Sequence, residues 1–492
     1  MAPDSVVVRT SLGALEGRWS GSVCSFLGIP YAAPPFGKFR MRPPQPVFPW
    51  TGTRLATAYG PTAPKGEYPA IYRPYFQEVV IPGEDCLNLN VWTPSPGAAG
   101  LPVLVWIHGG SFANGSSSIR EYAGWSFARD GVVCVTINYR LGLEGFLYLD
   151  DGLANLGLLD QIAALEWVHA NIAAFGGDPS KVTIAGESAG AMSVTCHLAS
   201  PLAEGLFTRA IAQSGYAADT LTPAQASLVA RHAAETLAIA NSRDEFRNIP
   251  PRDLALLSAS LVEEIELHPD AAKWGDVGSP FSPTVDGNLL PCNLLEGFEQ
   301  GRGDNVALLI GSNQHEARLT LVADGTIDAL TEDDLGTTAQ DLGLSAEGVH
   351  AYRRLHPSAS PGDLVATVLT DWFYSLSPIR VAEARSGHKT WVYRFDHPDT
   401  EDNHGLGSCH GAELPYVFDC VDLPEVRPRI GDSPNQNVAD LTHGTWVRFV
   451  GNGTTGWPSY SLPERPTAII REGLHTSADP HQTERLIWEG LR

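Results

Sequence analysis

The residues best suited to chemistry in this chain are 186–190, which read Gly-Glu-Ser-Ala-Gly. This G-x-S-x-G pattern follows a short apolar segment and precedes small residues that are typical of a helix start. In a strand–turn–helix context it predicts a nucleophile elbow, a turn so tight that the residues two before and two after the serine must be small. Such a turn presents the hydroxyl of Ser188 and the backbone N–H of Ala189 to the same space. A glycine-rich surface turn is the alternative interpretation of the pattern alone.

A serine hydroxyl is a weak nucleophile at neutral pH, so it needs a base within hydrogen-bond reach and an acid that orients the base. In α/β-hydrolases these groups follow in the order serine, acid, histidine. Glu316 comes shortly after an apolar segment at residues 306–311 that predicts a buried strand. His410 lies between glycines in a loop that follows another strand-like segment at residues 391–395. Chain order therefore predicts Glu316 as the acid and His410 as the base.

The elements that must position these residues alternate between strands and helices. Continuous apolar runs at residues 103–107 and 132–137 predict central strands, and residues 155–174 have apolar side chains at helical spacing. This alternation indicates a layered α/β sheet. Residues of about 217–300 and 330–386 predict helical excursions over the sheet and the site. We find no internal repeat and no long linker, so residues 1–492 predict a single domain.

Composition and charge exclude several classes of protein. The apolar fraction of 43% suits a soluble globular chain, and no apolar run is long enough to predict a transmembrane helix. A formal charge of −23 argues against binding to nucleic acids or to anionic membranes. The first residues lack the features of a secretory signal, and the seven cysteines are dispersed singly, which predicts free thiols in the cytoplasm.

Taken together, the motifs resemble the type-B carboxylesterase family, which includes bacterial para-nitrobenzyl esterases, animal carboxylesterases and cholinesterases. The resemblance extends over nearly the whole chain. It is carried by residues 26–35, 84–91, 106–112, 138–142, 155–190, 210–215, 281–287, 311–316 and 410–418. It implies an α/β-hydrolase fold with a mixed, mainly parallel central sheet flanked by helices. It also implies Ser188 as nucleophile, His410 as general base and then acid, and Glu316 as the orienting carboxylate, without a metal or an organic cofactor.

The resemblance further implies an oxyanion hole. Its backbone donors map to Gly110 and Ser111, in the glycine-rich turn after the first central strand, and to Ala189. The family usually has glycine or alanine where this chain has Ser111, and a serine retains the N–H while adding a hydroxyl. Such donors stabilise the negative charge that develops on the carbonyl oxygen during acyl transfer.

Several other residues are expected near the site with smaller roles. Gly109 and Glu187 are expected to adjoin the nucleophile, and Ser214 is a candidate hydrogen-bond partner of the triad. Phe112 and Phe373 line an apolar pocket or belong to the core, and the sequence leaves both open. His108 and the charged residues Arg140 and Asp160 are expected to be structural. His315, next to Glu316, is expected either to be structural or to line the gate of the site.

The sequence therefore predicts a serine carboxylesterase that acts on a small-molecule ester. A carbamate or amide hydrolase with the same triad is an alternative. A non-catalytic adhesion or scaffold relative is an alternative of another class, but such relatives typically lack a triad member or are secreted. The natural substrate, the acyl chain preference and the oligomeric state remain open at this point.

Overall fold

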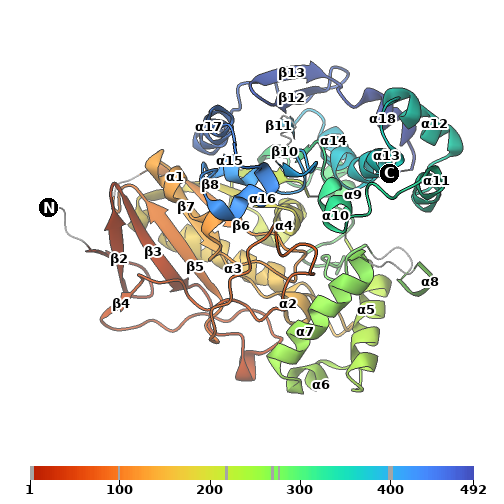
Figure 1. Ribbon diagram of the computed structural model, residues 1–492. Coiled ribbons are helices and arrows are strands. Elements are labelled where there is room, and N and C mark those ends of the chain that lie inside the picture. Colours follow the sequence, from red (N-terminus) through yellow and green to blue (C-terminus); the bar gives the residue numbers. More distant parts are fainter. Residues whose placement is uncertain are drawn as a thin grey trace.

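The structure, a computed structural model, describes residues 5–97, 100–215, 220–267, 271–274, 278–396 and 403–491. Its described strands form one 13-stranded sheet in the order β1-β2-β3-β5-β7-β6-β8-β9-β10-β11-β12-β13, with β4 paired to β2 (Figure 1). The strands are β1 (Ser5–Arg9), β2 (Ala14–Ser20), β3 (Val23–Pro30), β4 (Thr53–Leu55), β5 (Asn88–Thr93), β6 (Leu101–Ile107), β7 (Val133–Ile137), β8 (Gly177–Glu187), β9 (Arg209–Gln213), β10 (Ala307–Asn313), β11 (Thr390–Phe395), β12 (Pro466–Ile470) and β13 (Leu474–Ala478).

The strands from β7 to β12 in this order pair in parallel, and the outer strands of the main order pair antiparallel. Parallel neighbours all end at one edge of a sheet, so residues that follow β6, β8, β10 and β11 are brought to the same edge. The predicted mixed, mainly parallel sheet of an α/β-hydrolase is confirmed.

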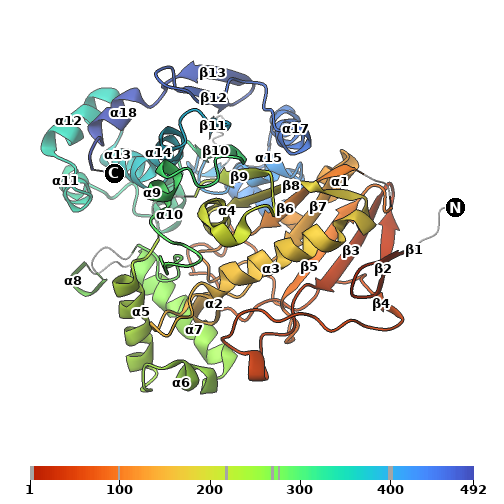
Figure 2. The ribbon, with the colours of Figure 1, turned by 180° about the vertical axis from the view of Figure 1, so that it is seen from behind.

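Helices cover both faces of the sheet. In Figure 2, α3 and α4 lie in front of the strands, whereas α15 and α17 lie on the opposite face, which Figure 1 shows. The helices are α1 (Trp125–Arg129), α2 (Gly142–Phe146), α3 (Leu156–Asn171), α4 (Ala189–Ala199), α5 (Pro223–Thr236), α6 (Arg243–Asn248), α7 (Pro251–Val262), α8 (Ala271–Trp274), α9 (Leu294–Glu299), α10 (Arg318–Ala323), α11 (Glu332–Asp341), α12 (Ala346–Leu355), α13 (Pro361–Thr370), α14 (Leu376–Ala384), α15 (Leu414–Val417), α16 (Arg427–Ile430), α17 (Gln436–Asn452) and α18 (Gln482–Ile487).

The central strand β6 shows why an apolar run was needed there. Val103, Val105 and Ile107 belong to the hydrophobic cluster shared with α3 and α4, while Leu104 and Trp106 belong to the cluster shared with α17. Because successive side chains of a strand point to opposite faces, both faces of β6 must be apolar to be covered on both sides.

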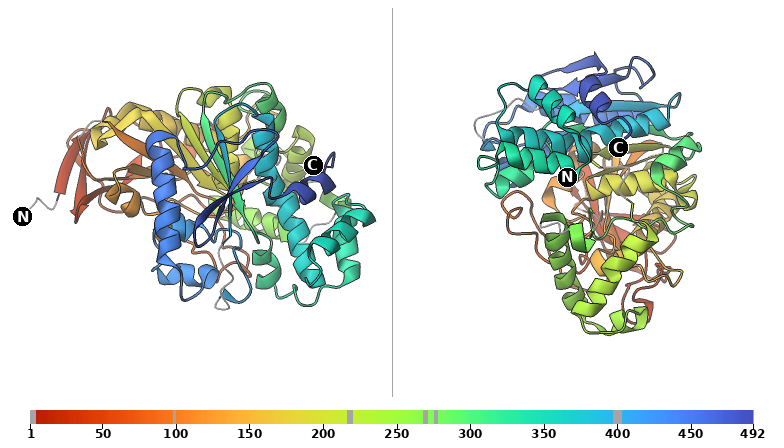
Figure 3. Two further views of the ribbon diagram at one scale, coloured as in Figure 1. Left: turned by 90° about the horizontal axis from the view of Figure 1, so that it is seen from above. Right: turned by 90° about the vertical axis from the view of Figure 1, so that its right-hand side faces the viewer.

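The segments where the sequence predicts helical excursions contain two separate groups of helices, and α18 adds to the second group; the bounds of about 217–300 and 330–386 stay a prediction. Figure 1 places α5, α6 and α7 at the lower right and α11, α12, α13 and α18 at the upper right, and the right-hand view of Figure 3 shows the two groups apart. Helix α5 begins with the capping box of Thr222 and Gln225 that its sequence predicts. The single-domain organisation over residues 1–492 stays a prediction.

The state of the cysteines and the character of the helices bear on the predictions of free thiols and of no transmembrane helix. All seven cysteines have free thiols, including Cys86. In the described ranges, no helix has both the length and the apolar character that crossing a membrane requires.

Arg140 and Asp160 form a buried ion pair, as their structural role predicts. Their side chains are 2% and 0% exposed, and two nitrogens of the guanidinium donate to the two carboxylate oxygens at 2.6 and 2.7 Å. Since removing one partner leaves the other charge buried and uncompensated, Asp160→Asn should lower the free energy of unfolding by about 3–5 kcal/mol. Chemical denaturation of the variant measures this loss.

Asp244→Asn is the control, because Asp244 pairs with Arg247 while its side chain is 90% exposed. Exposed pairs contribute about 0–1 kcal/mol. Equal losses in the two variants would contradict the buried pair's structural role.

Candidate active site

The nucleophile elbow lies between β8 and α4. Ser188 adopts φ 56° and ψ −126°, a strained conformation for a residue with a side chain, and its N–H donates to the carbonyl of Gln213 at 2.9 Å. A Cβ atom on Gly186 would lie 2.4 Å from the carbonyl carbon of Gly190, and one on Gly190 would lie 2.1 Å from the carbonyl oxygen of Ile107. Both flanking glycines are therefore required by close contact, which is the steric property that the motif predicts.

Gly109, in the turn after the neighbouring strand β6, must also lack a side chain. A Cβ atom there would lie 2.8 Å from the carbonyl oxygen of Glu187 and 3.1 Å from the Cβ of Ser188. The turn after β6 and the elbow after β8 are thus in direct contact.

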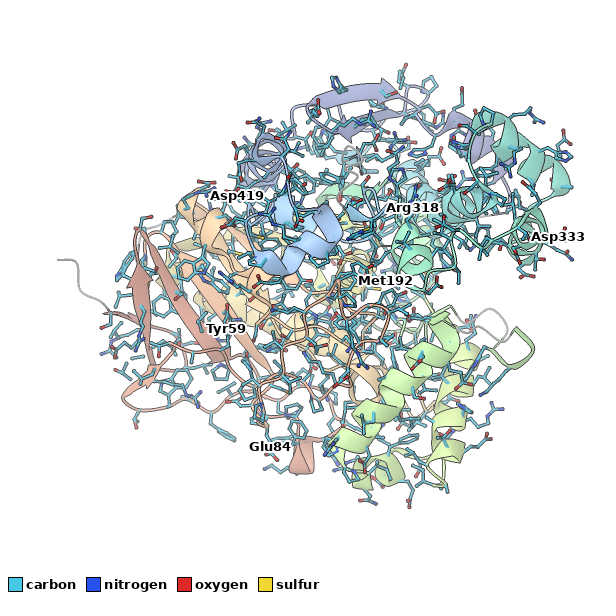
Figure 4. The ribbon with its side chains drawn as sticks, viewed as in Figure 1. Tyr59, Glu84, Met192, Arg318, Asp333 and Asp419 are labelled. Carbon is cyan, nitrogen blue, oxygen red and sulfur yellow. The ribbon has the colours of Figure 1, made fainter. Side chains whose placement is uncertain are left out.

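In Figure 4, Met192 in the first turn of α4 and Arg318 at the start of α10 both lie toward the centre of the view.

The predicted acid and base are paired, although 94 residues separate them. Nδ1 of His410 lies 2.7 Å from Oε2 of Glu316, and the N–H of His410 donates to the carbonyl of Glu316 at 3.3 Å. The other carboxylate oxygen of Glu316 accepts the backbone N–H of Asn313 at 2.6 Å. Glu316 follows β10, and His410 follows β11, so parallel neighbours bring the two side chains to one edge of the sheet. This arrangement leaves Nε2 of His410 free of Glu316.

The glycine-rich turn after β6 has the backbone geometry of a donor site. Gly110, Ser111 and Phe112 have φ values of 107°, 50° and 56°, and the carbonyl of Gly110 accepts the N–H groups of Ala113 and Asn114 at 2.9 and 2.8 Å. In a trans peptide unit the C=O and N–H point in opposite directions, so the N–H of Ser111 points away from the interior of this turn. Among the described residues, none provides an acceptor for the N–H of Gly110, Ser111 or Ala189.

The hydroxyl of Ser111 reaches the helical excursion. It donates at 3.0 Å to a carboxylate oxygen of Glu266, which lies in a π-helical turn at Glu263–Leu267 directly after α7. No motif in the sequence singles out Glu266. The side chain of Ser111 thus connects the glycine-rich turn after β6 with the first group of helices.

The two phenylalanines take different positions. Phe112 is 1% exposed and packs against Phe146, with 4.7 Å between ring centroids, so it belongs to the core. Phe373 is half-buried in a π-helical turn at Asp371–Ser375. The residue of that turn that contacts the candidate base is Tyr374, whose ring centroid lies 5.0 Å from that of His410.

Glu187 and Ser214 both lie beside the elbow. Oε1 of Glu187 is 3.2 Å from Nε2 of His410. Ser214 is buried at φ 53°, and its N–H donates to the carbonyl of Gly311. Its hydroxyl has no hydrogen-bond partner among the described residues, so the expected bond to the triad is not present.

Two histidines have structural surroundings, as expected. Nδ1 of His108 is 2.8 Å from the carbonyl oxygen of Gly109, its ring stacks on Tyr139, and burial lowers its pKa to about 3. His315 accepts the N–H of Ser408 at 3.2 Å. Neither bonds to Glu316.

A buried polar network behind the acid and base was not predicted. The carboxylate of Glu413 accepts amide N–H groups from Asn313 at 2.6 Å and from Gln213 at 3.0 Å, and Trp446 donates to the oxygen of Gln213 at 2.8 Å. The position of Glu413 three residues after His410 is the signal that could have found it. Within the described residues, no group of His, Cys, Asp and Glu side chains has a geometry that could hold a metal ion.

Charge raises the basicity of the candidate base. Burial alone would lower the pKa of His410, but three carboxylates, with that of Glu187 first, outweigh burial and raise the pKa to about 9. Burial also raises the pKa of Glu187 well above its ordinary value. Because charges in a water-poor site interact strongly, the protonation of these two side chains is coupled.

The parallel sheet, the strained serine between β8 and α4 and the imidazole–carboxylate pair on neighbouring strands together define an α/β-hydrolase with a serine-hydrolase type of site. Comparison with known proteins identifies the family within this class. The chain belongs to the carboxylesterase family, whose model matches residues 4–485.

Individual relatives cover nearly the whole chain. A para-nitrobenzyl esterase of Bacillus subtilis (strain 168) is 35% identical, with 97% of each chain covered. A phenmedipham hydrolase of Pseudarthrobacter oxydans is 33% identical, with 96% of this chain and 97% of the relative covered. The crystal structure of the Geobacillus stearothermophilus carboxylesterase EST55 at pH 6.2 superposes with a TM-score of 0.85 at 34% identity, covering 98% of this chain and 99% of the other. This protein is therefore a carboxylic ester hydrolase.

Replacing Glu187 should move the acidic limb of the pH–rate profile. A general base acts only when it is neutral, so kcat/KM should rise as the pH passes the pKa of His410. Because the Glu187 carboxylate raises that pKa, Glu187→Gln should lower it and shift the limb to lower pH. The measurement is kcat/KM for a neutral ester from pH 5 to 10 in both proteins. A limb that stays in place or moves to higher pH would show that Glu187 does not raise the pKa of the base.

Proposed function

We propose that Ser188 is the nucleophile of a serine carboxylesterase that hydrolyses small-molecule esters. The observation that carries this proposal is that Ser188 lies on a strained elbow after β8, at the same edge of the sheet as His410, which is bonded to Glu316 at 2.7 Å. In serine hydrolases, a serine on such an elbow is activated for acyl transfer by a histidine that a carboxylate orients.

In the first half-reaction, the serine oxygen attacks the carbonyl carbon of the ester while Nε2 of His410 accepts the hydroxyl proton. The tetrahedral adduct collapses, the bond to the alcohol oxygen breaks, and His410 returns the proton to the departing alcohol. In the second half-reaction, His410 takes a proton from water as the water oxygen attacks the carbonyl carbon of the acyl-enzyme. The second tetrahedral adduct then collapses, the bond to the serine oxygen breaks, and His410 returns the proton to that oxygen, which releases the carboxylic acid and free Ser188. Glu316 orients the ring and stabilises the imidazolium throughout.

The carbonyl oxygen gains negative charge in both tetrahedral adducts. We assign its stabilisation to the N–H groups of Gly110, Ser111 and Ala189. The described residues provide no acceptor for these groups, which supports this assignment. The position of Ala189 in the first turn of α4, where helix N–H groups lack partners, also supports it. In a well-studied serine hydrolase one such donor contributes about 10²–10³ in kcat. The chemistry uses no metal and no organic cofactor.

The remaining assignments concern where the enzyme acts and on what. We propose a cytoplasmic location on the basis of the seven free thiols, since oxidising compartments favour disulfides. We also propose that the partner is a small-molecule ester, and that neither a nucleic acid nor an anionic membrane surface is bound, because the chain carries a formal charge of −23.

Ser188→Ala tests the central assignment. With the nucleophile removed, kcat for short para-nitrophenyl esters should fall by about 10³-fold or more, as for other serine hydrolases. The control is Ser180→Ala, in the same strand, where the hydroxyl is exposed and bonds to Asp178 at 2.7 Å. That variant should keep the parent rate. Equal activity in Ser188→Ala and the parent would overturn the assignment.

Carbamate hydrolysis is a second candidate because of the relative that is a phenmedipham hydrolase. The matched pair para-nitrophenyl butanoate and para-nitrophenyl N-ethylcarbamate differs only by CH₂ against NH. We expect kcat/KM to be at least about tenfold higher for the ester, a difference of about 1.4 kcal/mol in activation free energy. A reversed ratio would favour carbamates as the physiological class, with loss of both activities in Ser188→Ala showing that one nucleophile serves both.

A further inference from the structure

A buried ion pair lies directly behind the turn that carries the oxyanion donors. Nζ of Lys65 is 2.6 Å from Oε1 of Glu78, and the two side chains are 0% and 15% exposed. Both residues come from the long irregular segment between β4 and β5, far from the triad in sequence. No motif identified either of them.

Both members of the pair bond to the far end of the oxyanion turn. Lys65 donates to the carbonyl of Gly115 at 2.6 Å. Oε2 of Glu78 accepts the side-chain amide of Asn114 at 3.0 Å and the N–H of Gly115 at 3.3 Å. The same amide of Asn114 also donates to the carbonyl of Gly66 at 3.0 Å. One end of the turn is thus held by four hydrogen bonds from a single segment.

These contacts determine the direction in which the backbone N–H of Ser111, one of the proposed oxyanion donors, points. The backbone N–H of Asn114, at 2.8 Å, is one of the two groups that hold the carbonyl of Gly110 inside the turn. That carbonyl and the N–H of Ser111 belong to one peptide unit, so rotating one rotates the other. Because Lys65 and Glu78 fix Asn114 and Gly115, they fix the plane of this peptide unit and the direction in which Ser111 donates.

Stability alone does not explain the pair. Removing two charges from water costs several kcal/mol each, and buried pairs often contribute no more than apolar side chains of equal size. Burial lowers the pKa of the Lys65 ammonium, and the Glu78 carboxylate opposes this shift. The segment is also closed without the pair, because Thr62 and Ile81 form three hydrogen bonds across it, at 3.0, 3.1 and 3.5 Å. The pair instead faces the turn.

We propose that Lys65 and Glu78 are positioning residues that aim the oxyanion donors through Asn114 and Gly115. This inference rests on the proposed function, since it assumes that the N–H of Ser111 binds the oxyanion. Neither side chain is a catalytic residue, because each acts on the reacting atoms only through the turn. Misdirected donors weaken binding of the tetrahedral adduct while leaving binding of the ground-state ester nearly intact, which lowers kcat rather than raising KM.

The test uses Lys65→Met and the isosteric Glu78→Gln in the full chain, with a neutral para-nitrophenyl ester and a trifluoromethyl ketone that forms a tetrahedral adduct. Burst titration of released para-nitrophenol counts active sites, so kcat refers to folded protein. We expect kcat to fall at least about tenfold, a part of what a whole donor contributes, with KM changed less than about twofold. Affinity for the ketone should fall in parallel with kcat/KM.

Asp479→Asn is the matched control, because Asp479 forms a similarly shielded ion pair with Arg485. The side chains of Arg485 and Asp479 are 10% and 12% exposed, and within the described part of the chain neither bonds to the oxyanion turn. Its thermal midpoint should fall as in the test variants while kcat and ketone affinity stay at the parent values. Unchanged kcat in Glu78→Gln, a rise in KM alone, or equal kcat losses in the control would each overturn the inference. Ser188→Ala distinguishes failure of the proposed function from failure of the positioning role. If Ser188→Ala keeps full activity, the proposed function is refuted. If Ser188→Ala is inactive while Lys65→Met and Glu78→Gln are fully active, only the positioning role is refuted.

Discussion

The structure depends on the contact between the elbow and the end of β6. There is no room for a side chain at Gly190 against the carbonyl of Ile107, nor at Gly109 against the elbow. Strand β6, strand β8 and helix α4 are therefore packed backbone to backbone. Because β6 leads into the oxyanion turn and β8 into Ser188, the contact that strains the serine also brings the proposed donors to it. Substrate binding does not have to create this arrangement, and such preorganisation is the main source of electrostatic catalysis.

The second requirement is electrostatic, since several carboxylates surround one imidazole in a largely buried site. Glu316 bonds to the ring, Glu187 lies beside Nε2, and Glu413 lies behind them. Such a cluster is tolerated only when each oxygen finds a donor or a proton. Asn313 supplies donors to two of the three carboxylates, through its backbone to Glu316 and through its side chain to Glu413. The acidic surroundings favour the imidazolium that forms when the base takes a proton.

The sequence was sufficient for the parts of the site that local sterics or chain order determine. The elbow follows from its glycines, and the candidate acid and base follow from their places after strands. Long-range contacts were not accessible in the same way: Gln213 and Glu413 are 200 residues apart, and Ser111 and Glu266 are 155 apart. Strands β12 and β13 were also missed, because β12 begins with a proline and β13 is an edge strand of mostly exposed polar residues. Edge strands of this kind lack the apolar periodicity on which such predictions depend.

The proposed oxyanion turn shows how a site built from backbone donors can include a residue other than glycine. Donors that are backbone N–H groups impose no residue type, so Ser111 is acceptable provided that its backbone reaches φ 50°. A serine reaches this region less readily than glycine, and the conformation persists only when its surroundings determine it. Here the surroundings come from both sides: Glu266 holds the hydroxyl, and Asn114 holds the preceding carbonyl. The positive φ of Ser111 is thus accompanied by contacts on both sides of the residue, and on the proposed assignment these contacts make residues outside the triad part of the donor geometry.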